Sequence, residues 1–291
     1  MLFNLNETQQ GWINGLIGVV IFAGSMPATR VAVQGFSPEF LTGARACIAA
    51  ILALILLLVL KQPRPSRQQL KSLCITSLGV VIGFPLFSAL ALQTETAAHS
   101  SIFVALLPIA TAFFAVLRAK EMPKRAFWLY ACIGSALIIF FMLQQSGLNG
   151  ISIGDLYMII AVLLCGLGYA EGGVLSRTLG GWQVICWALV IALPLMIPLF
   201  WLYLPSSFHG IPASAYIGLA YVSLFSMLIG FFFWYKGLAL GGIAKIGQIQ
   251  LIQPFIGLVF CAVLLNEHIS LVMIVVSLAV VSCVVMAKKH A

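Results

Sequence analysis

LLPIATAFFAVLRAKE, residues 106–121, returns 146 residues further on as IQPFIGLVFCAVLLNE, residues 252–267. Both stretches carry a proline near their start and end in a glutamate, with the same thirteen-residue separation between the two. The chain has only 12 prolines and 7 acidic residues, so these matches indicate duplication more strongly than matches between leucines would. The pairs found at this shift are Phe87 and Phe233, Ala98 and Ala244, Pro108 and Pro254, Phe114 and Phe260, and Glu121 and Glu267. The sequence therefore predicts two repeats, residues 1–146 and 147–291.

The composition around these stretches places the chain in a membrane. Of its 291 residues, 62% are hydrophobic and only 8% are charged. Soluble proteins have about 45–50% apolar and about 25% charged residues. So few charges do not cover the surface of a water-soluble protein of this size. This excludes a secreted disulfide-rich protein, a cytosolic enzyme and a soluble nucleic-acid-binding protein.

Apolar runs of membrane-spanning length recur along the whole chain. A helix needs about 20 apolar residues to cross the hydrocarbon core, and each run here is continuously apolar instead of alternating as barrel strands do. We therefore expect an all-α polytopic protein with ten transmembrane helices, five in each repeat. The predicted spans are 12–33, 40–60, 73–92, 98–117, 127–143, 155–175, 183–203, 215–236, 243–265 and 270–287.

An odd number of spans in each repeat makes the second repeat enter the membrane in the opposite sense to the first. Inverted repeats of this kind enclose a central site that opens to one side and then to the other. Lys and Arg in short loops stay on the cytoplasmic side. With both termini in the cytoplasm, thirteen of the fifteen Lys and Arg residues lie at cytoplasmic ends, and Arg30 and Arg45 are the exceptions.

Several short motifs resemble one transporter family. They are the stretch GSMPATR at residues 24–30, Pro38, Arg45, and the two proline-glutamate pairs of the repeats. Together they resemble the EamA branch of the drug/metabolite transporter superfamily. The resemblance implies ten spans as two five-helix repeats, both termini inside, and outward transport of amino acids, nucleosides, sugars, amines or drugs. Glu171 departs from the family, whose members are more often apolar or aromatic there.

Arginines at membrane depth are candidates for substrate binding, because they are expensive to bury without a partner. Arg30 lies near the outer end of the first span, where its guanidinium could hold a substrate carboxylate, with Thr29 beside it. The alternative is that Arg30 locks the helix bundle, for example through Glu39 or Glu95. For Arg45 we favour a structural role.

Glu171 is the candidate for proton coupling. It lies inside the sixth span, where a carboxylate could take up a proton in one state and release it in the other. The 146-residue shift pairs it with Ser25. The alternative is a salt bridge to a base at the cytoplasmic end, such as Lys236 or Lys245.

Other polar residues in the spans are candidates for lining a substrate cavity, with hydrogen bonding between helices as the alternative role. The candidates are Ser25, Ser88, His99, Trp234, Gln250 and Gln253. Pro27, Pro108 and Pro254 are candidate gating or kink positions, because proline deletes one backbone donor inside a helix. Glu121 and Glu267 precede the next span in each repeat, and we expect each to favour that helix's positive N-terminal end.

These features together predict a secondary transporter. The chain has no GxxxxGK[ST] phosphate-binding loop, no HExxH or GxSxG motif, and no paired CxxC spacing among its seven cysteines, so we expect no enzyme activity, cofactor or metal. We expect export of a small polar metabolite such as an amino acid across a bacterial inner membrane by alternating access. Coupling of this export to proton movement is one form of the mechanism. The alternatives are an uncoupled facilitator, a lipid-carrier flippase and a non-transporting partner subunit. The lipid bilayer is an expected partner, nucleic acid is not, and nothing indicates a homodimer.

Overall fold

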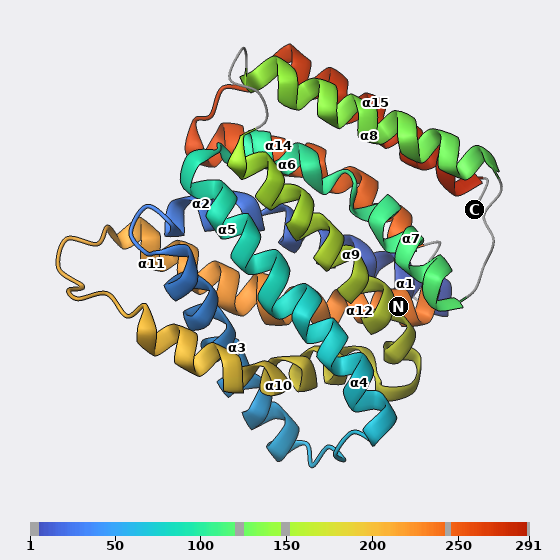
Figure 1. Ribbon diagram of the computed structural model, residues 1–291. Helices are drawn as coiled ribbons and strands as arrows, with labels where there is room; N and C mark the ends of the chain where they lie inside the picture. The colour runs from blue at the N-terminus through green and yellow to red at the C-terminus, as the bar shows by residue number, and fades with distance from the viewer. Residues whose placement is uncertain (1–5, 120–124, 147–151, 242–245, 290–291) are drawn as a thin grey trace, which may run out of the picture.

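The computed structural model describes residues 6–119, 125–146, 152–241 and 246–289, and no strand occurs in these ranges (Figure 1). The α-helices of the first half are α1 (Glu7–Ala23), α2 (Ser25–Ala32), α3 (Pro38–Val59), α4 (Arg67–Thr76), α5 (Phe84–Thr94), α6 (Ala97–Val104), α7 (Leu107–Ala119) and α8 (Arg125–Ser146). Those of the second half are α9 (Ile153–Leu179), α10 (Gly181–Leu202), α11 (Ala213–Ala220), α12 (Gly230–Gly241), α14 (Gln253–Leu265) and α15 (Leu271–Lys289). Two π-helical segments, η1 (Ser77–Gly83) and η3 (Tyr221–Ile229), and the 3₁₀ segment η4 (Gly247–Ile252) continue these helices.

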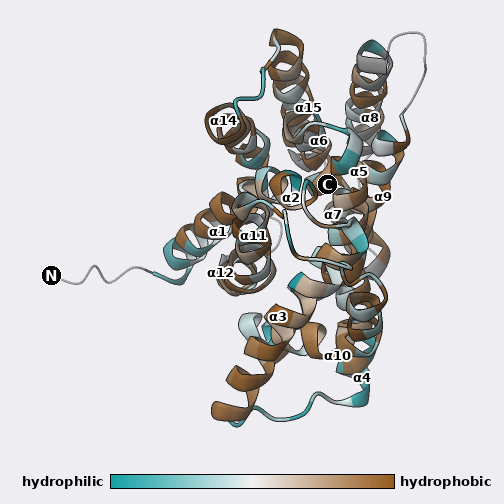
Figure 2. Cartoon of the chain, turned by 90° about the vertical axis from the view of Figure 1, so that its left-hand side faces the viewer, coloured by the Kyte–Doolittle hydropathy of each residue, from teal (hydrophilic) through white to brown (hydrophobic). Residues whose placement is uncertain are grey.

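The helices have the length and apolarity of membrane spans, which confirms the predicted polytopic membrane protein. In the described ranges, seven continuous helical segments qualify by length and composition, and shorter apolar helices lie within α8, η4 to α14, and α15. Figure 2 shows apolar residues along the helices and polar residues gathered at the start of α1 and in the connection between α3 and α4. The start of the ninth predicted span, the boundary at residue 147, and Glu121, Ala244 and Lys245 lie outside the described residues.

Helix starts recur at the spacing that the sequence pairs predict. The segments α1, α4, α5 and α7 each begin 146 residues before α9, α11, α12 and α14 respectively. The π-helical segments η1 and η3 also end 146 residues apart. The repeat therefore extends to the positions where helices begin and change their hydrogen bonding.

Three prolines that we proposed as gating or kink positions lie in the first turn of a helical segment, next to an interruption of the span. Pro27 follows the break at Gly24 between α1 and α2, Pro108 is the second residue of α7, and Pro254 is the second residue of α14. Proline is tolerated in the first turn because its missing N–H has no partner within the helix there. The spans are therefore interrupted near these prolines and restart with them.

The two repeats are interlocked in space. The first span of each repeat packs on the third span of the other: α1 lies along α12, and α9 lies along α5. The second spans, α3 and α10, pack together, and α8 and α15 lie side by side at one edge of the molecule (Figure 1). Residues of both repeats therefore meet in the middle.

Glycines allow the closest of these approaches. A Cβ built at Gly79 would lie 2.5 Å from the Leu164 carbonyl oxygen and 2.7 Å from the Gly168 Cα. A Cβ at Gly237 would lie 2.8 Å from the backbone nitrogen of Gly15. Because backbone atoms, not flexible side chains, occupy these positions, any side chain would force the helices apart.

We therefore expect Gly79→Ala to destabilise the protein in detergent by about 1–3 kcal/mol, the usual effect of overpacking. Its melting temperature, measured by intrinsic fluorescence, should fall by several degrees. Gly134→Ala is the matched control, because a Cβ there meets its nearest atom, the Cys283 Cβ, at an ordinary 3.4 Å. An equal fall in both variants would contradict the close-packing account.

Candidate functional site

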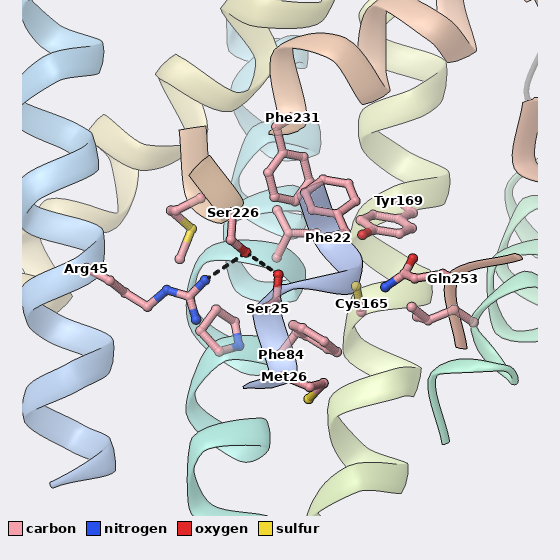
Figure 3. Close-up of a pocket in the computed structure, with 14 residues that line it drawn as sticks. Phe22, Ser25, Met26, Arg45, Phe84, Cys165, Tyr169, Ser226, Phe231 and Gln253 are labelled. Atoms are coloured by element: carbon pink, nitrogen blue, oxygen red, sulfur yellow. Dashed lines mark hydrogen bonds between the residues drawn. The ribbon is translucent and has the colours of Figure 1, made fainter. Parts of the chain in front are cut away.

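A small cavity lies in the middle of the molecule, between the two repeats (Figure 3). Its volume is about 20 Å³, which leaves room for one or two water molecules. The lining residues come from the first, second, third and fourth spans of the first repeat and from the first, third and fourth spans of the second. They are Phe22, Ser25, Met26, Arg45, Val80, Phe84, Pro85, Leu107, Cys165, Tyr169, Ser226, Met227, Phe231 and Gln253.

Repeat-related positions face this cavity together. Three pairs of lining residues stand 146 residues apart: Val80 and Ser226, Pro85 and Phe231, and Leu107 and Gln253. In each pair the first repeat supplies an apolar residue, and in two of the three the second repeat supplies a polar one. The cavity therefore lies where the duplicated sequence would place a shared site, but its two sides differ in chemistry.

A chain of hydrogen bonds runs along one wall of the cavity. The guanidinium of Arg45, which is only 3% exposed, donates from Nη2 to the Ser226 Oγ and to the Val222 carbonyl oxygen, each at 3.2 Å. The Ser226 Oγ lies 2.7 Å from the Ser25 Oγ, so the serines of η3 and α2 bond to each other (Figure 3). The Arg45 Nε is buried without a hydrogen-bond acceptor.

Aromatic rings form the opposite wall. Phe22 packs edge-on against Phe231 with ring centroids 4.9 Å apart, and Tyr169 stacks on Phe22 at 6.2 Å. Trp234 lies behind these rings, 5.6 Å from Tyr169, and its indole Nε1 has no hydrogen-bond acceptor. These contacts join α1, α9 and α12 around the cavity.

Gln253 links the central cavity to a second one. The second cavity, of about 10 Å³, shares Phe22, Met26 and Gln253 with the first and extends toward Ser101 and Gly257. The Gln253 Oε1 is buried without a donor, and Gln250 on the preceding turn is buried with both amide atoms unpartnered. Gln253 and Ser101 therefore bring polar groups to the second cavity, between α6 and α14.

A polar cluster joins the repeats at the end of the bundle that the charge distribution predicts to be outside. The His99 Nε2 lies 2.7 Å from the Asp155 Oδ1 and 3.8 Å from the Glu95 Oε2. The Ser152 hydroxyl donates to the Glu95 Oε1 at 2.7 Å, and its oxygen caps α9 by accepting from the Asp155 backbone. These contacts tie α5 and α6 of the first repeat to α9 of the second.

Glu267 makes a second connection between the repeats at this end. Its two carboxylate oxygens accept hydrogen bonds from the backbone N–H groups of Ala97 and Ala98, at 3.0 and 2.7 Å. A carboxylate at a helix N-terminus is favourable, as the sequence predicted for Glu267. The helix was predicted wrongly, however, because Glu267 binds the start of α6 in the other repeat, not that of α15.

The predicted binding residues fall into several places. Ser25 and Gln253 line the cavity, and Trp234 supports its aromatic wall. Thr29 and Ser88 are buried nearby, and the Ser88 hydroxyl donates within its own helix to the Pro85 carbonyl oxygen. The part of each residue in binding stays a prediction.

Arg30 and Glu171 are not among the residues that line the cavity. The Arg30 Nη1 donates to the carbonyl oxygens of Leu92 and Gln93, which end α5, so the guanidinium binds the last turn of a helix. Glu171 is 5% exposed within α9, and its neighbour Gly172 faces the Tyr235 hydroxyl. Pro27 faces an apolar lateral groove, and Pro254 lines the second cavity.

Sequence reasoning missed Arg45 and Ser226 as cavity residues. Arg45 was interpreted as structural, and Ser226 was one of many small residues in an apolar span. The 146-residue register would have paired Ser226 with Val80, but a pair of such common residues carries no signal alone. Among the described residues no cluster of three or more His, Cys, Asp or Glu side chains is arranged to hold a metal ion.

Comparisons with known proteins agree with this architecture. The EamA-like transporter family matches the chain twice, over residues 9–143 and 152–287. An uncharacterized transporter of Bacillus subtilis (strain 168), YdeK, is 54% identical over 287 residues, which are 99% of this chain and 100% of that protein. A solved crystal structure of another protein aligns with this chain with a TM-score of 0.66 and 16% sequence identity. The alignment covers 95% of this chain and 96% of the other chain. That structure is similar in fold.

Proposed function

The chain belongs to the EamA-like transporter family, and on that premise we propose that it is a secondary transporter that exports a small polar metabolite, such as an amino acid. Transport would run through the central cavity by alternating access across a bacterial inner membrane, with both termini in the cytoplasm. The observation that carries the proposal is the cavity itself, which residues of both repeats line in the middle of the molecule.

The cavity's surroundings support a moving closure. The polar cluster at Glu95, His99 and Asp155 and the Glu267 contact join the two repeats at one end of the bundle. Discontinuous helices adjoin the cavity, as they do at the binding sites of other inverted-repeat transporters. In alternating access, these contacts would break when this end of the bundle opens and form again when it closes.

The lipid-carrier alternative has less support. A flippase for a phosphate-bearing lipid needs a basic pocket open to the side. Two grooves between helices have no Lys or Arg among the residues that line them. One, of about 580 Å³, lies beside Trp12 and Phe255, and the other, of about 370 Å³, lies beside Pro27 and Phe260. A non-transporting partner subunit gives no reason for a cavity shared by two repeats.

The test of the proposal is exchange in proteoliposomes. Purified protein is first screened by thermal shift against amino acids, nucleosides, sugars and amines. Each compound that raises the melting temperature is then loaded into proteoliposomes, and uptake of its radiolabelled form from outside is followed. Counterflow above that of protein-free liposomes is expected for at least one compound, and its absence for all of them would refute the proposal.

Proton coupling through Glu171 is a separate prediction. We expect Glu171→Gln to abolish accumulation driven by a pH gradient and to spare counterflow, because exchange needs no net proton movement. Glu7→Gln, at an exposed position at the start of α1, is the matched control. Unchanged driven transport in Glu171→Gln would remove Glu171 from the mechanism. A wild-type protein that never accumulates the compound would instead be an uncoupled facilitator.

A further inference from the structure

We propose that Arg45, together with the hydroxyl groups of Ser25 and Ser226, forms the subsite that holds a carboxylate of the transported molecule. The inference rests on the proposed transport function and names the chemical class of its substrate. Arg45 comes from α3, Ser25 from α2 and Ser226 from η3, so the subsite joins the two repeats (Figure 3).

The first argument is charge. Arg45 is the one charged residue among the fourteen that line the cavity. Within the described part of the chain, the pairs of basic and acidic side chains that lie within 4.0 Å of each other all involve His99. No carboxylate oxygen of the described residues therefore lies within 4.0 Å of the Arg45 guanidinium. A buried cation without an anion is unfavourable, and a bound anion would relieve that penalty.

The second argument is the count of hydrogen-bond donors. The two serine hydroxyls have two hydrogens and share one bond, so one hydrogen remains, whichever serine donates in that bond. The Arg45 Nε also lacks an acceptor. This wall of the cavity therefore has donors in excess. A carboxylate is the complementary group, because its two oxygens only accept hydrogen bonds.

The third argument separates carboxylate from phosphate. The wall carries a single positive charge, which a monoanion neutralises. A phosphate dianion would leave a net negative charge beside Phe22, Phe84 and Phe231, with no second cation among the lining residues to balance it. On the opposite side, the Gln253 Oε1 lacks a donor, so the chemistry there complements a hydrogen-bond donor at the other end of the substrate (Figure 3).

Arg30 is the rival position, and its surroundings differ. Its Nη1 already donates to the carbonyl oxygens of Leu92 and Gln93 at the end of α5. Those carbonyls carry the negative end of a helix dipole, which compensates an arginine without any ligand. Arg30 is therefore satisfied by the protein, whereas Arg45 is not.

The experiment uses matched pairs of probes that differ only at the carboxylate. They are L-leucine and L-leucinamide, L-phenylalanine and L-phenylalaninamide, lactate and lactamide, and nicotinate and nicotinamide. Thermal shift and equilibrium binding are measured on the purified full-length protein in detergent. We expect at least one carboxylate to bind and its amide to bind at least about thirtyfold more weakly, the usual loss when a buried charge pair is broken.

Variants then assign this preference to a residue. Arg45→Gln should remove the preference for the carboxylate over the amide, and Arg45→Lys should retain part of it, because lysine keeps the charge and loses the planar fork. Ser226→Ala should weaken carboxylate binding about tenfold through one lost hydrogen bond, and it tests the same subsite if the Arg45 variants do not fold. Arg177→Gln, at an exposed end of α9, is the matched control.

The outcomes separate this inference from the transport proposal. Loss of the carboxylate preference in Arg30→Gln, with Arg45→Gln unaffected, would overturn the inference, as would a panel in which only amides bind. If such amides still show counterflow, the transport proposal stands. If a carboxylate binds through Arg45 but shows no counterflow in proteoliposomes, the subsite stands and the transport proposal fails.

Discussion

Asp155→Asn is expected to open the central cavity to reagents added from outside the cell. The Asp155 carboxylate, 1% exposed, holds the buried His99 ring at 2.7 Å, and the contact joins α9 to α6 across the two repeats. If the outer ends of the repeats separate in the outward-open state, this bond exists only while the cavity is closed. Replacing the charged acceptor by a neutral amide then shifts the balance toward the open state by about 1–3 kcal/mol, or about 5- to 150-fold in population.

Cys165 provides the measurement, because its side chain lines the cavity and is 1% exposed. In a protein that keeps Cys165 and has the other six cysteines replaced by serine or alanine, its labelling by an impermeant anionic methanethiosulfonate is followed in intact cells. The replaced residues are Cys47, Cys74, Cys132, Cys186, Cys261 and Cys283. Asp155→Asn should raise the labelling rate about fivefold or more.

Two further variants test whether the contact itself is responsible. His99→Gln removes the other partner and leaves the cap of α9 by Ser152 and Asp155 in place. Because both changes break one contact, their effects in the double variant should not add. Glu39→Gln is the control, since Glu39 also lies at the predicted outer end, in the first turn of α3. Equal labelling in wild type and Asp155→Asn, or an equal rise in Glu39→Gln, would contradict the prediction.

Much of the fold could be predicted because local physics determines it. Each membrane span must satisfy its backbone hydrogen bonds within itself, so length and apolarity suffice to place a helix. The proline positions also follow a local rule, because Pro27, Pro108 and Pro254 each lie in the first turn of a helical segment. The repeat register was readable because proline and glutamate are rare in this chain.

The site was less predictable because its residues meet across the interlocked repeats. Sequence gives the depth of Arg45 in a span but not which helix faces it, and its partner Ser226 is 181 residues away. Arg30 shows the reverse. The sequence indicated either substrate binding or a lock on the helix bundle, and in the structure the guanidinium donates hydrogen bonds to carbonyl oxygens of α5. Whether a buried charge is compensated by the protein depends on tertiary neighbours, which a single sequence does not specify.

Removal of the Glu267 carboxylate is the second change with a large expected effect. The helix that Glu267 binds also depends on tertiary neighbours. Its carboxylate accepts hydrogen bonds from two backbone N–H groups in the first turn of α6. N–H groups in a first turn have no acceptor within their own helix. Hydrogen bonds to a charged group contribute about 1.5–3 kcal/mol each, more than neutral ones. We expect Glu267→Ala to lower the melting temperature in detergent by about 5 °C or more, since about 1 kcal/mol corresponds to about 2–4 °C in a protein of this size.

A graded series identifies the cause of that loss. Glu267→Gln keeps one carbonyl acceptor and should fall between wild type and Glu267→Ala. Glu39→Ala removes a carboxylate from the first turn of its own helix, α3. Among the described residues, the Glu39 side chain has no hydrogen bond to the other repeat. A general preference for negative charge at helix starts would make Glu39→Ala and Glu267→Ala equally destabilising. The hydrogen bonds between the repeats predict instead a much larger fall in melting temperature for Glu267→Ala, because in that variant two N–H groups of the other repeat lose their acceptor.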